Sequence, residues 1–345
     1  MLRGACIRVL AGAARLPRPA ASAGPAAAAA AAVRRPPGAG ATLSARRSGR
    51  VAAGLGRSAS STASSSSSSS GFDSGGGGDM YGMPALYDEV FGYRDFEEEA
   101  AFVRAAYKRH CPGRPLGTLL ELGCGPARHA VLLAAADTRV WALDASPAML
   151  AYAQGLARAA GARVNFVEGD MSGFALPELE SGLDAAICLL GTFAHMTTND
   201  SAVACFSCVS RHLRPGGMLL LELAHPGDLF DGSLLIGDDG GEMWEVDSAA
   251  AGGKLLVEWG TAGDDFDPET QVLARTVSVC RLEDGEAGEE LHASRVRQRA
   301  FTLQELDLLG RLAGLRLAGV YGDLSLKVGL THEDAYRLVT CFVKE

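Results

Sequence analysis

Between residues 116 and 223, short runs of uninterrupted apolar residues alternate with segments whose apolar residues recur at helical spacing. Continuous apolar strands that alternate with helices are typical of a parallel sheet covered on both faces. The sequence therefore predicts an α/β fold. Strands are expected over 116–122, 139–143, 164–167, 183–190 and 218–223, and helices over 128–136 and 147–160, the latter with Ser146 as its cap and Pro147 at its first position.

The segments on either side of this core have different patterns. Apolar residues from 86 to 107 have the spacing of one or two amphipathic helices. After residue 225 the pattern has period 2, which predicts an antiparallel insertion over 226–301 with strands at 255–259, 272–282 and 291–301. Thr302 and Glu305 form a capping box that opens a helix. Two last strands, 315–321 and 335–343, complete a predicted seven-stranded sheet.

The first 72 residues contain ten arginines, no lysine and no acidic residue. A segment rich in Arg and Ser and free of acids is typical of an organelle transit peptide, although a merely disordered tail is an alternative. We therefore expect 1–79 to be a transit peptide and a disordered Ser/Gly-rich linker, and 80–345 to be the folded domain. The Leu2-Arg3 start indicates a mitochondrial transit peptide, whereas the Ser-rich stretch and residues 45–53 indicate a chloroplast one. We expect the mitochondrial matrix slightly more than the chloroplast stroma.

The charge of the remainder limits the class of partner. The whole chain has a formal net charge of −9, so the residues after the tail carry a much larger negative charge. Such a body repels phosphate backbones and anionic membrane surfaces. No stretch of 18 strongly apolar residues is present, so we expect a soluble protein with no nucleic-acid or membrane partner. Cysteines scattered through a long domain favour free thiols in a reducing compartment.

The first predicted strand ends in a glycine turn, Leu-Gly-Cys-Gly-Pro-Ala, where Gly123 and Gly125 allow the backbone to approach a ligand closely. Asp144 lies 19 residues after Gly125, at the end of the second strand, where its carboxylate can accept hydrogen bonds from ribose hydroxyls. Asp170 follows the third strand and can face an adenine edge. Three strand ends thus meet at one crevice.

Two cofactors fit this pattern. A dinucleotide fold needs a third glycine in G-x-G-x-x-G, which is absent, and Glu121 at the strand end would oppose a pyrophosphate. A carboxylate there suits a cation instead. The sulfonium and ammonium of S-adenosylmethionine satisfy this requirement, with Glu121 acting through the loop backbone or water.

At these residues the sequence resembles the class I S-adenosylmethionine-dependent methyltransferase superfamily. The resemblance includes Leu120-Glu-Leu-Gly-Cys-Gly125, Val140-Trp-Ala-Leu-Asp-Ala-Ser-Pro-Ala-Met-Leu150, Leu183–Gly191 and His212–Gly217. It implies a Rossmann-like seven-stranded methyltransferase sheet with helices on both faces and an antiparallel lid after the fifth strand. The implied S-adenosylmethionine contacts are Glu121, Gly123, Cys124, Gly125, Asp144, Ala145, Met149, Asp170, Met171 and Leu189.

Within that superfamily the chain is similar to small-molecule methyltransferases, including amino-sugar N-methyltransferases, which carry an N-terminal Tyr-Asp helix like Leu86-Tyr-Asp88. By analogy His195 would face the reacting methyl group as a base, with His225 a weaker candidate, and Tyr87 would close over the cofactor or orient the substrate. Alternatively, Tyr87 is a half-buried packing residue, and His195 is a structural histidine whose ring nitrogens are hydrogen-bonded within the protein. Ala127 stands where the superfamily usually has glycine, and we expect a right-handed backbone there.

The pair Cys205 and Cys208 lacks a second pair at zinc spacing, so no metal site is predicted. The acidic clusters 97–99 and 264–267 are expected to be solvated. A small metabolite methylated at N, O or S is the predicted substrate, and the antiparallel insertion is a candidate homodimer contact. The alternatives are a nicotinamide-dependent oxidoreductase on a Rossmann fold and a catalytically inactive interaction module.

Overall fold

The computed structural model describes residues 80–134, 138–176, 178–230, 242–261, 263–283 and 285–345. The predicted transit peptide and linker lie outside the described residues, so both stay predictions. No described helix combines the length and the apolar composition that crossing a membrane requires.

The main sheet has seven strands in the order β11-β12-β5-β4-β1-β2-β3. Strands β1 to β5 pair in parallel, β12 pairs antiparallel with β5, and β11 pairs antiparallel with β12. The bounds are β1 Thr118–Leu122, β2 Arg139–Asp144, β3 Val164–Glu168, β4 Leu183–Cys188, β5 Leu213–Ala224, β11 Leu315–Tyr321 and β12 Arg337–Lys344. The chain order reverses between β1 and β4, and ligands of open α/β sheets bind at such a point.

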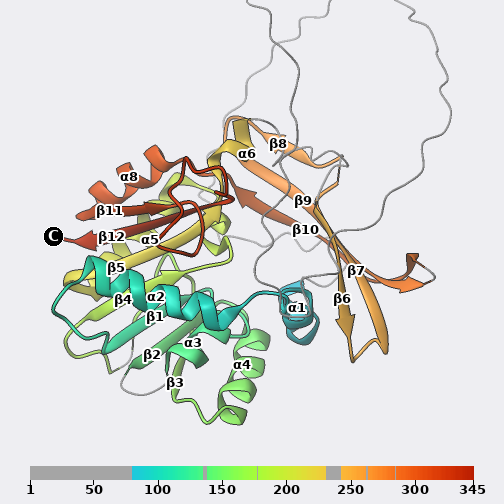
Figure 1. The fold of residues 1–345 in the computed structure, drawn as a ribbon, viewed down its shortest axis with the longest axis horizontal. Helices are drawn as coiled ribbons and strands as arrows, with labels where there is room; N and C mark the ends of the chain where they lie inside the picture. The colour runs from blue at the N-terminus through green and yellow to red at the C-terminus, as the bar shows by residue number, and fades with distance from the viewer. Residues whose placement is uncertain (1–79, 135–137, 177, 231–241, 262, 284) are drawn as a thin grey trace, which may run out of the picture.

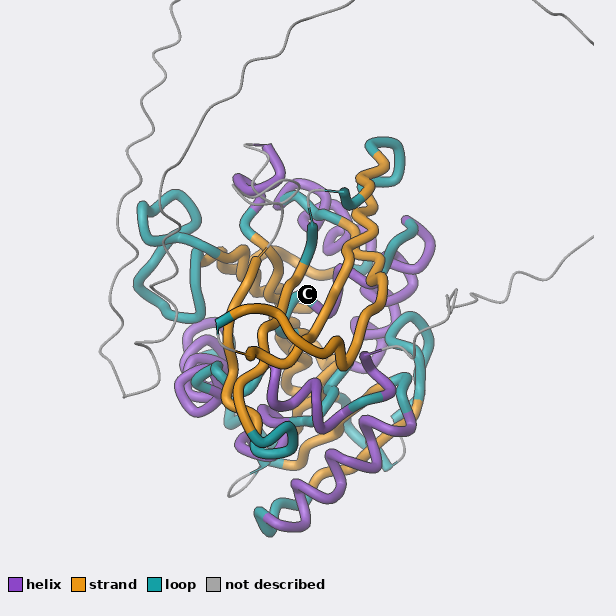
Figure 2. The backbone as a smooth tube through the Cα atoms, turned by 90° about the vertical axis from the view of Figure 1, so that its right-hand side faces the viewer, coloured by secondary structure: helices purple, strands orange, loops and turns teal. Residues whose placement is uncertain are grey.

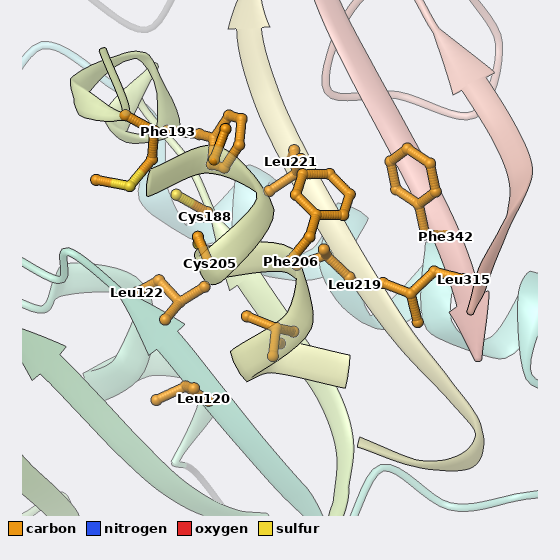
Figure 3. Close-up of a cluster of buried hydrophobic side chains, with 14 of the residues drawn as sticks. Leu120, Leu122, Cys188, Phe193, Cys205, Phe206, Leu219, Leu221, Leu315 and Phe342 are labelled. Carbon is orange, nitrogen blue, oxygen red and sulfur yellow. The ribbon is translucent and has the colours of Figure 1, made fainter. Parts of the chain in front are cut away.

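Helices cover both faces of this sheet (Figure 1). One face packs against α2 (Phe96–His110), α3 (Arg128–Leu133) and α4 (Pro147–Ala159). The other packs against α5 (Asn199–His212) and α8 (Leu303–Leu312). Figure 3 shows the second core, where Phe206 of α5 meets Leu219 and Leu221 of β5 and Phe342 of β12. The view turned by 90° shows the helices around the strands (Figure 2).

Alternation along the strands decides which face each side chain reaches. On β1, Leu120 and Leu122 lie in the α5/α8 core, whereas Leu119 lies in the α2/α3/α4 core. Glu121 therefore points toward α2 and α3. By the same rule Glu222 of β5 shares the face of Leu220. The two buried glutamates of the central strands thus face the same helices.

A second sheet of five strands contains β10-β9-β7-β6, with β8 paired to β9. Its strands are β6 Glu242–Ser248, β7 Gly253–Trp259, β8 Asp265–Asp267, β9 Val272–Glu283 and β10 Glu286–Arg299. Two short helices of the N-terminal region, η1 (Met80–Gly82) and α1 (Pro84–Val90), pack against this sheet through Met80 and Val90. Figure 1 shows α1 between the main domain and the second sheet.

The predicted α/β architecture, both capping signals and the antiparallel insertion are confirmed, and η2 (Thr192–His195) and α6 (Pro226–Phe230) complete the described elements. Ser146 Oγ accepts from the Met149 amide, and Thr302 and Glu305 form the capping box. Strands β6 and β8 were not predicted. Strand β5 begins at Leu213 because Leu213 already pairs with Leu183 of β4.

The expectation of a right-handed backbone at Ala127 is wrong. Ala127 has φ 57° and ψ 36°, in the left-handed region. Its amide donates to the Cys124 carbonyl at 2.7 Å, which closes a tight turn just before α3. The left-handed conformation costs a residue with a Cβ about 1–2 kcal/mol, and the fully buried methyl group offsets part of that cost.

Candidate functional site

A cavity lies where the carboxyl ends of β1 and β4 meet the helix α1. We call it the β1–β4 cavity. Its lining comes from four places in the sequence: the helix α1 and the start of α2, the end of β1 with the turn that follows, the start of α3, and the segment after β4. The lining residues are Tyr87, Asp88, Phe91, Phe96, Glu121, Gly123, Cys124, Gly125, Pro126, Arg128, His129, Leu189, Leu190 and Thr192.

The glycine turn forms one wall because it has no side chains at two positions. Gly123 has φ 56° and Gly125 has φ 50°, a conformation that favours glycine. A Cβ on Gly123 would lie 2.2 Å from Thr192 Cγ2, whereas one on Gly125 would meet the Tyr87 ring at 3.6 Å. The turn is therefore held close to the segment after β4.

Asp144 ends β2 beside this turn. Its carboxylate accepts from the Gly125 amide at 2.7 Å and from the Ser146 amide at 2.8 Å. Burial raises the pKa of Asp144, and these backbone hydrogen bonds oppose that shift. Each carboxylate oxygen has a second lone pair that remains able to accept from a hydroxyl group. The Asp144 carboxylate thus fixes the glycine turn and can also accept hydrogen bonds from the ribose hydroxyls of a ligand.

Glu121 contacts the first turn of α3, and its predicted action on the cofactor through the loop backbone or water stays a prediction. Its Oε2 accepts from the Ala130 amide at 2.9 Å, in the first turn of α3, and its Oε1 lies 3.1 Å from His129 Nδ1. Glu121 and His129 are both buried, and both line the β1–β4 cavity. Negative charge at a helix N-terminus is favourable. The cavity wall therefore carries an oriented carboxylate, which suits a cationic ligand.

Buried ionic contacts continue from this wall to the other side of the cavity. His129 Nε2 lies 2.6 Å from Glu99 Oε2, and Arg94 Nε donates to Glu99 Oε1 at 2.7 Å. Arg94 then binds Glu222 through both terminal nitrogens at 3.0–3.1 Å, and Glu222 accepts from the Leu190 amide at 2.8 Å. We call Glu121, His129, Glu99, Arg94 and Glu222 the ion-pair chain. It ties β1, α3, α2 and β5 together around the cavity.

The helix α1 is fixed over the cavity by its own aspartate. Asp88 accepts from Arg128 Nε at 2.8 Å and from a second nitrogen of Arg128, and the Tyr152 hydroxyl donates to it at 2.8 Å. The Ser146 hydroxyl donates to the Tyr81 carbonyl at 2.9 Å, which anchors η1 at the N-terminus of α4. Side chains of α3 and α4 thus position the Tyr-Asp segment.

His195 ends the short helix η2, which begins at the cavity residue Thr192. Its Nε2 lies 2.9 Å from the Tyr81 hydroxyl, and the two rings meet edge to face at 5.5 Å. The Tyr81 ring also lies 5.8 Å from that of Tyr87. A histidine and a tyrosine hydroxyl therefore stand together beside the cavity, in an arrangement that can pass a proton.

The other predicted residues divide into two groups. Tyr87, Glu121, Gly123, Cys124, Gly125 and Leu189 line the β1–β4 cavity. The remaining predicted residues, Asp144, Ala145, Met149, Asp170, Met171 and His195, lie outside that lining, although Asp144 binds the glycine turn and Met171 Cε comes within 3.8 Å of the Cβ position on Gly123. Their predicted contacts with a cofactor stay predictions.

Three of those residues have surroundings that bear on the prediction. Met149 is buried, whereas Ala145 is exposed. Asp170 is also exposed and accepts from both the amide and the hydroxyl of Ser172. His225, the weaker histidine candidate, contacts the Leu330 carbonyl through Nε2 and accepts from the Gly227 amide through Nδ1. Both of its nitrogens therefore have structural partners.

Sequence reasoning missed Tyr81, Arg94, His129 and Glu222. Glu222 interrupts the apolar run of β5, and a charged residue inside a buried strand signals a buried partner. The expectation that 97–99 is solvated is wrong for Glu99, which is buried because it pairs with Arg94 and His129, whereas Glu97 and Glu98 are exposed. Among the described residues no three His, Cys, Asp or Glu side chains form a metal-binding group.

Comparison with known proteins finds a methyltransferase domain within the chain. Residues 119–217 match the family model of a methyltransferase domain. The cypemycin N-terminal methyltransferase of a Streptomyces species is 28% identical over 213 residues, which span 61% of this chain and 78% of that protein. A dTDP-3-amino-3,6-dideoxy-alpha-D-glucopyranose N,N-dimethyltransferase from Streptomyces fradiae is 29% identical over 129 residues, which span 37% of this chain and 47% of that enzyme.

Solved structures share the fold. An S-adenosylmethionine-dependent methyltransferase from Clostridium acetobutylicum has a TM-score of 0.60 at 18% identity, and the match covers 77% of this chain and 99% of that one. A sugar N-methyltransferase from a Streptoalloteichus species has a TM-score of 0.58 at 19% identity, with 82% and 100% covered. At these identities the likeness concerns the fold alone.

Proposed function

We propose that the chain is a class I S-adenosylmethionine-dependent methyltransferase that methylates the nitrogen of a small-molecule amine. The observation that carries the proposal is the contact of His195 Nε2 with the Tyr81 hydroxyl beside the β1–β4 cavity, which offers a base to an acceptor that arrives protonated. An alkylamine is protonated at neutral pH and cannot attack until a proton leaves. A histidine is the side chain that most readily accepts a proton there.

The sequence relatives support the same acceptor. Both the cypemycin enzyme and the Streptomyces fradiae enzyme are named for methylation at nitrogen. The acidic charge of the chain agrees with a cationic substrate, because it raises the local concentration of cations.

When bound, S-adenosylmethionine supplies a methyl group on an activated sulfonium carbon. The protein then mainly has to align the acceptor and exclude water. Asp144 would accept from the ribose hydroxyls, the turn at Gly123 and Gly125 lets the backbone approach the cofactor, and Glu121 presents its carboxylate toward the cationic end. His195, oriented by the Tyr81 hydroxyl, would accept the proton that the amine loses.

The test is a calorimetric titration of the full chain with S-adenosylmethionine, S-adenosylhomocysteine and NADH. We expect micromolar binding of the first two and none of NADH. A screen of matched small amines, alcohols and thiols should then give methyl transfer to amines. Transfer only to alcohols or thiols would refute the nitrogen assignment, binding without any transfer would favour an inactive module, and binding of NADH alone would favour an oxidoreductase.

Asp144→Ala should weaken S-adenosylmethionine binding by about 1–3 kcal/mol, the scale of a hydrogen bond to a charged group. Calorimetry measures the change. Asp200→Ala is the comparison, because Asp200 is an exposed aspartate of α5 and is not among the implied cofactor contacts. Unchanged affinity in Asp144→Ala would remove that residue from the ribose role.

A further inference from the structure

His129 stands between two carboxylates in the wall of the β1–β4 cavity. Its Nδ1 lies 3.1 Å from Glu121 Oε1, and its Nε2 lies 2.6 Å from Glu99 Oε2. Only 2% of the residue is exposed, and the Phe96 ring covers it edge to face at 5.1 Å. The imidazole is therefore shut off from solvent, and its two nitrogens both face carboxylate oxygens.

This arrangement assigns a charge to the ring. A neutral imidazole has one donor nitrogen and one acceptor nitrogen, and the acceptor would face a carboxylate lone pair. Glu99 is held as a carboxylate because Arg94 donates to its other oxygen. Glu121 already accepts from the Ala130 amide. With both carboxyl groups ionised, donors are needed at both ring nitrogens, and only the imidazolium provides two.

The pKa values of His129 and Glu99 agree with this geometry. Burial alone would lower the pKa of His129, but the hydrogen bonds to Glu121 and Glu99 raise it to about 9. Burial would likewise raise the pKa of Glu99, yet its contacts with His129 and Arg94 lower it. The imidazolium therefore keeps its proton across the neutral range.

We propose that His129 is a positioning residue for cofactor binding: its imidazolium holds the Glu121 carboxylate charged and oriented toward the cavity that receives the cationic cofactor. The inference rests on the proposed function, since it takes the ligand to be S-adenosylmethionine. Without the ring cation, Glu99 and Glu121 would face each other as buried like charges. One of them would then take up a proton, and its attraction for a cation would be lost.

The other titratable groups around the pair do not share this role. On the remaining elements, Tyr87, Cys124, Asp144 and Cys188 interact electrostatically with Glu121, and Glu222 is linked to Glu99 through Arg94. Asp88 and Arg128 line the same cavity and pair with each other. Burial raises the pKa of Tyr87 and of both thiols, so they stay neutral between pH 6 and 9. Asp144 and Glu222 contact backbone amides or Arg94 and touch neither ring nitrogen.

The first test measures S-adenosylmethionine affinity against pH in His129→Gln. Relative to the unmodified protein, we expect binding to be about tenfold weaker at pH 6.5, with the deficit shrinking to about threefold at pH 8.5 as Glu121 ionises. A purely structural role would give the same deficit at both pH values, and that result would overturn the proposal. The double variant His129→Gln with Glu121→Gln should show such a constant deficit, because the titrating carboxyl is gone. His332→Gln, at an exposed histidine, controls for the substitution itself.

The second test needs neither cofactor nor variant stability. Nitrogen NMR of the ¹⁵N-histidine-labelled full chain should give an imidazolium signature for His129 up to about pH 8.5, assigned in the unmodified protein by through-bond correlation of the ring to its own backbone amide. A neutral ring at pH 7.5 would overturn the proposal even if the variant did not fold. Failure of the unmodified protein to bind S-adenosylmethionine would refute the proposed function instead, and a persistent imidazolium would still support the charge assignment.

Discussion

Replacing Arg94 by methionine is expected to lower the free energy of unfolding by about 3–5 kcal/mol, the cost of removing one partner from a buried ion pair. The Arg94 side chain is 9% exposed and that of its partner Glu222 only 1%. Methionine keeps an unbranched apolar stem of similar reach but leaves Glu99 and Glu222 without their shared cation. Chemical denaturation monitored by circular dichroism at pH 7.5 measures the loss.

Two variants separate this effect from a general loss of arginine. Arg109→Met, at an exposed position of α2, the helix that follows Arg94, should change stability by no more than about 0.5 kcal/mol. Arg94→Lys keeps the charge but loses the paired contact with Glu222, so its deficit should lie between the two. A loss below about 1 kcal/mol in Arg94→Met would contradict the view that the ion-pair chain holds the site together.

The deficit should also depend on pH. In Arg94→Met, Glu99 keeps only His129 as a cationic partner and Glu222 only Arg337, whose Nε lies 3.5 Å away. We therefore expect burial to raise the folded-state pKa of these two carboxyl groups above their unfolded values. The folded variant then binds more protons than the unfolded chain, so its stability rises as pH falls through those raised values. The gap to the unmodified protein should therefore be smaller at pH 5 than at pH 7.5. A gap that stays constant would place the damage in lost packing.

The strand and helix order could be predicted because it depends on local periodicity. Uninterrupted apolar runs mark the buried strands, and the residues Ser146, Pro147, Thr302 and Glu305 mark helix starts by local hydrogen bonding. Strand β8 was not predicted because three residues are too few to show an alternation of apolar and polar side chains. Residue Ala127 was misjudged because its left-handed backbone follows from the turn that Gly123 and Gly125 impose.

The ion-pair chain could be predicted only in part. Period 2 places Glu121 and Glu222 on one face, but the residues that meet them come from segments far away in the sequence. Arg94 contacts Glu222 across 128 positions, and Tyr81 contacts His195 across 114. Such pairings depend on how α1 and α2 lie over the sheet, which no local pattern encodes. The position of α2 over the sheet also decides that Glu98 is exposed and Glu99 buried, so the sequence pattern alone does not predict this difference.

His195→Gln is expected to lower kcat for an amine substrate by about 10²–10⁴-fold, the usual range for loss of a positioned base. Glutamine is close in size and keeps a polar end near the Tyr81 hydroxyl, so the fold should persist. S-adenosylmethionine affinity should change little, because the proposed role of His195 is toward the amine rather than the cofactor. Steady-state kinetics and calorimetry measure the two quantities.

The pH dependence of that variant decides what His195 does. If the ring takes the proton of the amine, His195→Gln must rely on amine that is already neutral in solution. Its kcat/KM should then rise about tenfold per pH unit below the substrate's own pKa, so that the deficit shrinks at high pH. His225→Gln, whose ring nitrogens both have structural partners, should keep the unmodified pH profile. A pH-independent deficit in His195→Gln would instead mean that the ring only orients Tyr81 and the substrate.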